Sequence, residues 1–176
     1  EANAQAVERV RSQGADDNER TAVVVGYGLV GRTVDRLLRQ AGVRTVIIDM
    51  NMDTVTELRA SGRIAIFGDA ASREVLEQSG AVDAKYLLVT MAANSNPVPV
   101  VLHARALNPD MHILVRSRYL KERSELTLAG ATGAVFEEAE AAIALGELVL
   151  KDLGADAETV ERETTSLRLS IAGGLA

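Results

Sequence analysis

Residues 23–38 read VVVGYGLVGRTVDRLL, and this stretch decides the fold. Three valines lead into Gly26, Gly28 and Gly31, which have the spacing of a dinucleotide-binding loop between a strand and a helix. In such a loop the first glycine allows a tight turn, the second lets the backbone approach a phosphate, and the third lets helix and strand pack closely. The free N–H groups and the dipole of the helix then favour an anion.

Short β-branched segments alternate with helical patterns from Thr21 onward, as in the βαβ units of a parallel sheet. The predicted strands are TAVVV (21–25), RTVIID (44–49), RIAIFGD (63–69), KYLLVT (85–90), HILVRS (112–117) and AVF (134–136). The predicted helices between them span 30–40, 52–60, 72–80 and 96–107. This alternation predicts an α/β fold, a Rossmann-like doubly wound parallel sheet of six strands with helices on both faces.

Both ends of the chain lie outside this alternation. Residues 1–20 combine EANAQAVERVRS, which can form a polar helix, with the linker-like QGADDNER, and we predict a leader that joins the domain to another module. The start without methionine fits a processed protein and an excised fragment equally well. We expect the nucleotide-binding domain at 21–154 and a C-terminal tail at 155–176, whose final IAGGLA is expected to be disordered.

The composition excludes several classes of protein. A chain of 176 residues suits one domain, and with 47% hydrophobic but only 3% aromatic residues its core is aliphatic. The net charge of -6 and the scarcity of aromatic side chains argue against a nucleic-acid partner. No cysteine is present, and His103 and His112 form no ligand pattern, so no metal site is predicted. No segment approaches the ~20 apolar residues of a membrane span.

Asp49 ends the second predicted strand, at about 20 residues from the glycine loop as the dinucleotide-binding pattern requires. Its carboxylate can accept hydrogen bonds from ribose hydroxyls and would repel a 2′-phosphate. The expected ligand is therefore NAD-like or a simple adenine nucleotide, rather than NADP. A structural turn with a surface aspartate is the alternative.

Further polar residues follow the other strands at the same edge. Asp69 can cap the next helix, form a turn or face the adenine, and Asn96 is a candidate N-cap ahead of Pro97. Arg116 and Arg118 are two residues apart, so they point to the same side if the strand continues that far. One of them can reach a ligand phosphate or a partner's carboxylate. A solvated pair is the alternative.

Catalytic groups are missing from the sequence. A dehydrogenase must move a proton together with the hydride, and short-chain enzymes use Tyr-x-x-x-Lys for this step. None of Tyr27, Tyr86 and Tyr119 has a lysine four residues later, and neither histidine lies in an evident proton-transfer arrangement. We therefore predict a sensor without catalytic residues. A small NAD-dependent oxidoreductase with unrecognised catalytic residues is the alternative.

Three segments together resemble the RCK N-terminal (TrkA-N) domain, a cytosolic nucleotide-binding regulator of bacterial potassium channels and transporters. They are VVVGYGLVGRTVDRLLRQAGVRTVIIDMN (23–51), GDAASREVLEQSGAVDAKYLLVT (68–90) and ILVRSRY (113–119), within a resemblance that covers about 21–153. Through VFEEAEAAIALGELVLKDLG (135–154) the chain is most similar to the C-terminal domains of Kef-type monovalent cation:proton antiporters.

The resemblance implies that an adenine nucleotide, AMP, ADP or NAD(H), binds at the carboxyl edge of the sheet. Arg116 is implied near the phosphates or the dimer interface. The predicted site residues are Gly26, Tyr27, Gly28, Leu29, Val30, Gly31, Asp49, Met50, Asn51, Gly68, Asp69, Ala70 and Arg116.

The resemblance also implies that the leader joins a transmembrane antiporter module of the same polypeptide. The domain would then gate potassium or cation transport at the cytoplasmic face of the bacterial inner membrane. Glutathione-gated Kef proteins place an asparagine early in the helix after strand four. This chain has PVPVV (97–101) there, so glutathione gating is not expected.

A C-terminal crossover helix is predicted over 137–153 and motivates a homodimer. Apolar residues at spacings of three and four form a first stripe along this helix, and Leu145, Leu148 and Val149 widen the apolar surface beyond it. A helix with so much apolar surface needs two partners, of which a second copy of the chain is one. Packing against its own sheet alone is the alternative. The first stripe consists of Ala139, Ile143, Gly146, Leu150 and Leu153.

Overall fold

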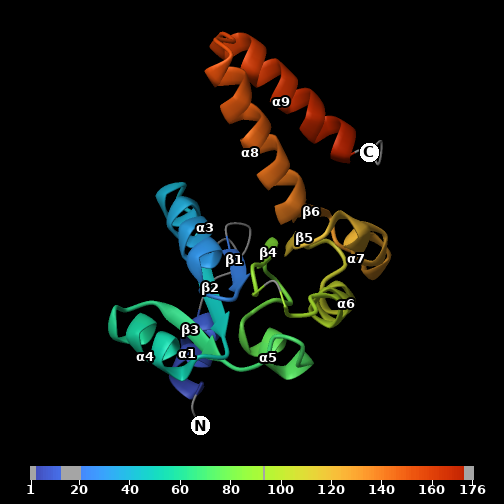
Figure 1. Cartoon of the computed structure of the whole chain (residues 1–176). Helices are drawn as coiled ribbons and strands as arrows, with labels where there is room; N and C mark the ends of the chain where they lie inside the picture. Colours follow the sequence, from blue (N-terminus) through green and yellow to red (C-terminus); the bar gives the residue numbers. More distant parts are fainter. Residues whose placement is uncertain (1–2, 13–20, 93, 173–176) are drawn as a thin grey trace.

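A computed structural model describes residues 3–12, 21–92 and 94–172 (Figure 1). Its six strands form one parallel sheet in the order β3-β2-β1-β4-β5-β6, which confirms the predicted doubly wound Rossmann-like fold. The strands are β1 (Thr21–Val25), β2 (Arg44–Asp49), β3 (Ile64–Phe67), β4 (Tyr86–Val89), β5 (His112–Ser117) and β6 (Gly133–Phe136).

Helices cover both faces of the sheet, and alternate residues of each strand supply the two cores. On β1, Val24 faces α3 and α4, whereas Val23 and Val25 face α5, α6 and α7. The predicted helices agree with the observed ones to within two residues at each end, and between β1 and β6 the helix α7 and the 3₁₀ turn before it were not predicted. The bounds are α3 (Leu29–Gln40), α4 (Met52–Ala60), α5 (Arg73–Gln78), α6 (Val98–Leu107), η1 (Leu120–Glu122) and α7 (Arg123–Ala129).

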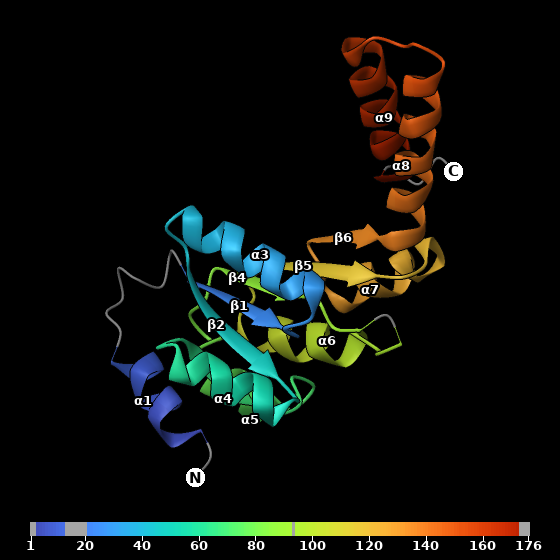
Figure 2. The same cartoon turned by 60° about the vertical axis from the view of Figure 1, so that its left-hand side comes forward.

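A helical hairpin projects from the β6 side of the sheet (Figures 1 and 2). The predicted crossover helix is α8 (Glu137–Asp152), which packs against α9 (Ala157–Ala172). The segment predicted only as a tail therefore contains a 16-residue helix. Val160 and Thr164 of α9 are buried, and such sparse apolar spacing did not predict a packed helix. Of the predicted disordered IAGGLA, the first two residues close α9 and the last four lie outside the described residues.

The leader contains a helix, as predicted, and this helix lies against the sheet. Helix α1 (Ala4–Arg11) packs beside the edge strand β3 (Figure 1), with Ala6 buried and Val7 and Val10 against the main core. The linker-like residues 13–20 lie outside the described residues. Across the described ranges, no helix combines the length and the apolar character that a membrane span requires.

Candidate functional site

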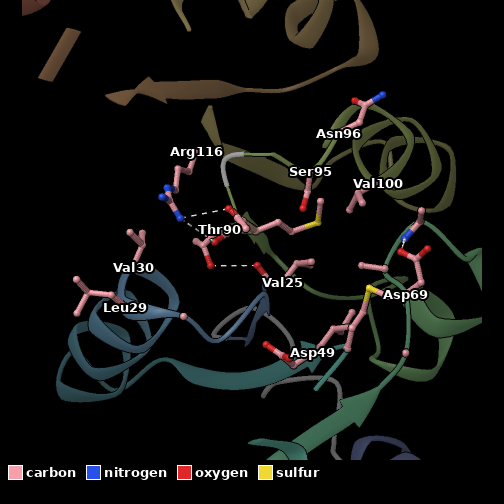
Figure 3. Close-up of a pocket in the computed structure, with 18 residues that line it drawn as sticks. Val25, Leu29, Val30, Asp49, Asp69, Thr90, Ser95, Asn96, Val100 and Arg116 are labelled. Atoms are coloured by element: carbon pink, nitrogen blue, oxygen red, sulfur yellow. Dashed lines mark hydrogen bonds between the residues drawn. The ribbon is translucent and has the colours of Figure 1, made fainter. Parts of the chain in front are cut away.

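A cavity of about 730 Å³ opens where β1 to β5 end at the carboxyl edge of the sheet (Figure 3). This is the point where the strand order reverses between β1 and β4, the usual ligand position in doubly wound sheets. Most of the predicted site residues line the cavity, namely Gly28, Leu29, Val30, Asp49, Met50, Gly68, Asp69, Ala70 and Arg116. The other predicted residues, Gly26, Tyr27, Gly31 and Asn51, are not among the lining residues.

The three glycines of the loop have different surroundings. Gly26 has a φ of +88°, and a Cβ there would lie 3.1 Å from the Cα of Met91. A Cβ on Gly31 would lie 2.0 Å from the carbonyl oxygen of Gly26, so only glycine fits this contact between helix and strand. Nothing lies within 4 Å of a Cβ built on Gly28. Gly28 is therefore the place where a ligand can approach the loop backbone, at the N-terminus of the twelve-residue helix α3.

Asp49 lies at the end of β2, and two backbone amides fix its carboxylate. Its Oδ2 accepts a hydrogen bond from the N–H of Tyr27 at 2.6 Å, and its Oδ1 accepts one from the N–H of Asn51 at 2.7 Å. The side chain of Asn51 in turn caps α4. Each carboxylate oxygen has capacity for a further hydrogen bond, so Asp49 can accept ligand hydroxyls without releasing the loop.

Behind the loop, Asp35 of α3 is completely buried. It accepts hydrogen bonds from the Tyr27 hydroxyl at 3.0 Å, the Thr45 hydroxyl at 2.6 Å and the Arg63 guanidinium at 2.6 Å. Burial alone would raise the pKa of Asp35, but the hydrogen bonds from Arg63 and Thr45 and the charge of Arg63 together lower it. Burial, followed by the contact with Asp35, raises the pKa of Tyr27, so its hydroxyl stays protonated and donates.

Arg116 lines the cavity near the first turn of α3 (Figure 3). Its guanidinium pairs with Glu137, the first residue of α8, and also donates to the carbonyls of Met91 at 3.2 Å and Thr90 at 3.4 Å. The carboxylate that Arg116 binds therefore belongs to its own chain, whereas the sequence suggested a ligand phosphate or a partner's carboxylate. This ion pair links the cavity directly to the projecting hairpin.

Three other polar residues had several possible roles in the sequence. The Oδ1 of Asp69 accepts a hydrogen bond from the N–H of Ala71 at 2.9 Å, so Asp69 forms a turn and also lines the cavity. The Oδ1 of Asn96 accepts from the N–H of Val98 at 3.0 Å, but the N-cap of α6 is Pro97, so Asn96 lies one residue before the cap position predicted for it. Arg118 lies beyond the end of β5, and its guanidinium is 5.0 Å from the ring centre of the next residue rather than in the cavity.

The segment after β4 supplies lining residues that sequence reasoning missed. The hydroxyl of Thr90 donates to the carbonyl oxygens of Gly26 at 2.8 Å and Val25 at 3.0 Å, so it fastens the glycine loop to β4. The position of this segment after a strand of the same parallel sheet was the available indication. The missed lining residues here are Thr90, Met91, Ala92, Ser95 and Val100.

The three tyrosine side chains lie outside the cavity. The hydroxyl of Tyr27 faces Asp35, Tyr86 stacks with His112 with ring centres 5.5 Å apart, and Tyr119 packs under cationic side chains. Among the residues that the structure describes, none of the cavity lining is tyrosine, histidine or lysine. Within the same described ranges, no group of three or more histidine, aspartate or glutamate side chains is arranged to hold a metal ion.

The proteins similar to this chain include a proposed cation transporter. The chain is 34% identical over 128 residues to YbaL of Escherichia coli (strain K12), a proposed cation/proton antiporter, and this match covers 73% of the chain. The chain spans only 23% of the length of that relative. The crystal structure of the TrkA-N domain of YbaL matches with a TM-score of 0.70, covering 73% of this chain and 96% of that one.

A second solved structure contains a ligand. The Kef C-terminal domain of Shewanella denitrificans in its AMP-bound form is 26% identical and has a TM-score of 0.76. The match covers 88% of this chain and 94% of that one. The family model of the TrkA-N domain matches residues 22–137, and the chain belongs to the TrkA-N domain family.

Proposed function

We propose that the chain is a regulatory domain that binds an adenine nucleotide, AMP, ADP or NAD(H), in the cavity at the carboxyl edge. The observation that carries the proposal is the pairing of an open backbone at Gly28, at the N-terminus of α3, with a fixed carboxylate at Asp49. The helix terminus suits a phosphate and the carboxylate suits ribose hydroxyls. Similarity to a domain with bound AMP supports the same assignment.

We further propose that the domain gates a potassium or cation transporter, a Kef-type cation:proton antiporter joined through the leader. The chain would then work at the cytoplasmic face of the bacterial inner membrane. The similarity to YbaL, a proposed cation/proton antiporter, supports this proposal. Binding of NADH without its consumption, tested with a panel of carbonyl compounds, distinguishes this sensor from a small NAD-dependent oxidoreductase.

Asp49→Asn is expected to weaken binding of AMP by about 1 to 3 kcal/mol, because the ribose hydroxyls lose a charged acceptor. Isothermal titration calorimetry measures the effect. The amide introduced by this substitution would also face the two backbone N–H groups that the carboxylate binds, so part of any loss can come from the loop itself.

A ligand without ribose hydroxyls separates the two contributions. For 2′,3′-dideoxy-AMP, Asp49→Asn should cost much less affinity than it costs for AMP. Equal losses for the two ligands would mean that Asp49 supports only the loop. Tighter binding of NADP than of NAD would also contradict the assignment, because a 2′-phosphate would face the carboxylate.

We propose that the chain forms a homodimer through α8 and the neighbouring sheet surface. On α8, Ile143 is buried and Gly146 and Leu150 are half-buried on one side. The other side remains exposed although α9 packs against the helix. On the sheet, β5 and β6 also expose apolar side chains. The exposed residues are Leu145, Leu148 and Val149 on α8 and Leu153 directly after it, with Leu114 and Val135 on the strands. Exposed apolar side chains in such number are typical of an interface.

Sedimentation at micromolar concentration is expected to give twice the chain mass of 18.7 kDa. Leu148→Glu should shift the protein to the monomer, because a charge would be buried in the interface. Leu128→Glu is the matched control, since Leu128 is exposed near the end of α7 and is not part of the proposed interface. A wild-type monomer, or a dimer that survives Leu148→Glu, would contradict the proposed interface.

A further inference from the structure

The side chain of Asn3 makes an unusual set of hydrogen bonds. Asn3 occupies the N-cap position of α1, where asparagine normally accepts hydrogen bonds from the first helical amides, but its side chain makes no such bond. Instead, Oδ1 accepts from the N–H of Phe67 and Nδ2 donates to the carbonyl of Phe67, both at 2.9 Å. Because the backbone N–H can only donate and the carbonyl can only accept, these bonds also fix the orientation of the amide.

These bonds replace the missing neighbour of an edge strand. β3 is the last strand on its side of the sheet, so Phe67 directs its N–H and C=O away from β2. The Asn3 amide offers one donor and one acceptor, as a residue of a further strand would. Arg59 of α4 completes the arrangement: it donates to Asn3 Oδ1 at 2.7 Å and to the carbonyl of Ala65 at 2.8 Å. Gln78 of α5 accepts from Asn3 Nδ2 at 2.9 Å.

Phe67 is the residue directly before the Gly68–Asp69–Ala70 segment that lines the cavity. On the inner side, the N–H of Gly68 donates to the carbonyl of Asp49 at 3.1 Å. On the outer side, Asn3 binds Phe67. The start of the cavity segment is therefore fixed between the ribose-side aspartate and the leader helix.

The rest of α1 is docked by packing. Ala6 is buried, and Val7 and Val10 lie against the main core. Val10 also lies so close to Gly80, after α5, that a Cβ on that glycine would be 2.7 Å from its Cγ1. Undocking of α1 would therefore expose this apolar face and release Phe67 in one event.

We propose that Asn3 is a positioning residue for the Gly68–Asp69–Ala70 segment, so that docking of the leader helix and occupancy of the cavity are coupled. The coupling rests on the proposed nucleotide binding. This coupling is reciprocal. If docking of the leader helix favours nucleotide binding, nucleotide binding must favour docking of the leader helix by the same free energy. If the leader joins the domain to another module, a change in the docking of the leader helix would reach that module.

The first test needs no ligand. In hydrogen exchange followed by NMR, Asn3→Ala should speed exchange of the Gly68 amide by about fivefold or more, because Phe67 is free to move and local opening becomes easier. Asn3→Asp, which keeps the acceptor for the Phe67 N–H but places an oxygen against the Phe67 carbonyl, should also speed it. Ser12→Ala is the control, since the Ser12 hydroxyl bonds only within the leader. Unchanged exchange at Gly68 in both Asn3 variants would overturn the proposal.

The second test uses AMP and trypsin. AMP should slow cleavage after Arg9 and Arg11 about fivefold or more in the wild type, and this ratio should approach one in Asn3→Ala. A purely structural role would make the variant faster to cleave but leave the ratio with and without AMP unchanged. Calorimetry should show AMP affinity about three- to tenfold lower in Asn3→Ala than in the wild type.

The outcomes separate this inference from the proposed function. If AMP binds the wild type and Asn3→Ala with equal affinity and slows tryptic cleavage of the leader in neither protein, the coupling is wrong, but the proposed nucleotide binding is not affected. If no nucleotide binds the wild type, the proposed function and the coupling both fail. The exchange rate of Gly68 then still decides whether Asn3 positions the segment.

Discussion

Asp35→Ala is expected to lower the free energy of unfolding by about 3 to 5 kcal/mol, because it leaves Arg63 facing a buried site with no counter-charge. The Arg63 side chain is only 17% exposed, so water replaces little of the lost contact. The change also removes the acceptor for the Tyr27 and Thr45 hydroxyls. Urea denaturation measures the effect, and an unchanged denaturant slope would show that the variant and the wild type unfold by the same transition.

The same carboxylate predicts a dependence of stability on pH. The contacts of Asp35 lower its pKa in the folded protein below the ordinary value of 3.8. Its contribution is therefore fully present above about pH 4 and is lost as the pH falls through the lower folded-state pKa. The wild type should lose more stability than Asp35→Asn over this acidic range, because asparagine does not titrate.

Tyr27→Phe is the matched control for this network. It removes one hydrogen bond to Asp35 and keeps the ring, so the expected cost is about 0.5 to 1.5 kcal/mol. If Asp35→Ala also lowers the free energy of unfolding by only about 0.5 to 1.5 kcal/mol, the ion pair between Asp35 and Arg63 adds nothing to stability.

The fold followed from the sequence because local patterns and the tertiary arrangement agree. In β1 all five residues are buried, as a central parallel strand requires, and short apolar runs of this kind are easily recognised. The glycine spacing then fixed the position of the cavity. The chain ends were harder to predict, because α9 and α1 carry few apolar residues and depend on contacts far away in the sequence. Asn3 and Phe67, for example, are 64 residues apart.

The candidate site was predictable in part for a similar reason. The sequence pattern does not distinguish the surroundings of its three glycines. Gly26 and Gly31 pack against backbone, and of the three only Gly28 faces open space. The motif also says nothing about Thr90, which directly follows β4 and whose hydroxyl reaches the loop although it lies more than 60 residues later in the chain. The network around Asp35 could not be inferred either, because Tyr27, Asp35, Thr45 and Arg63 come from separate segments of the chain.

Gly28→Asp is expected to reduce the affinity for AMP by about 100-fold or more, which corresponds to about 2.7 kcal/mol. The new carboxylate would lie at the N-terminus of α3 and repel the phosphate. Folding should be unaffected: Gly28 has a φ of -71°, nothing lies within 4 Å of its Cβ position, and aspartate is a favoured N-cap residue. Adenosine is the control ligand, because it has no phosphate. A similar loss for adenosine would show that the substitution distorts the whole site.

The same variant tests gating, because it removes nucleotide binding without removing the domain. The connection from the cavity to α8 is the pair between Arg116 and Glu137, and a phosphate that attracts Arg116 would weaken its hold on the first turn of that helix. Nucleotide would then favour one arrangement of the hairpin, with a coupling of about 1 to 3 kcal/mol. In vesicles carrying a polypeptide that joins this domain to the proposed transmembrane transporter, ion flux should respond to AMP in the wild type and not in Gly28→Asp. In Glu137→Gln, which frees Arg116 in advance, the response should be smaller although AMP still binds. Flux that is identical with and without nucleotide in the wild type would mean that the domain binds its ligand without gating the transporter.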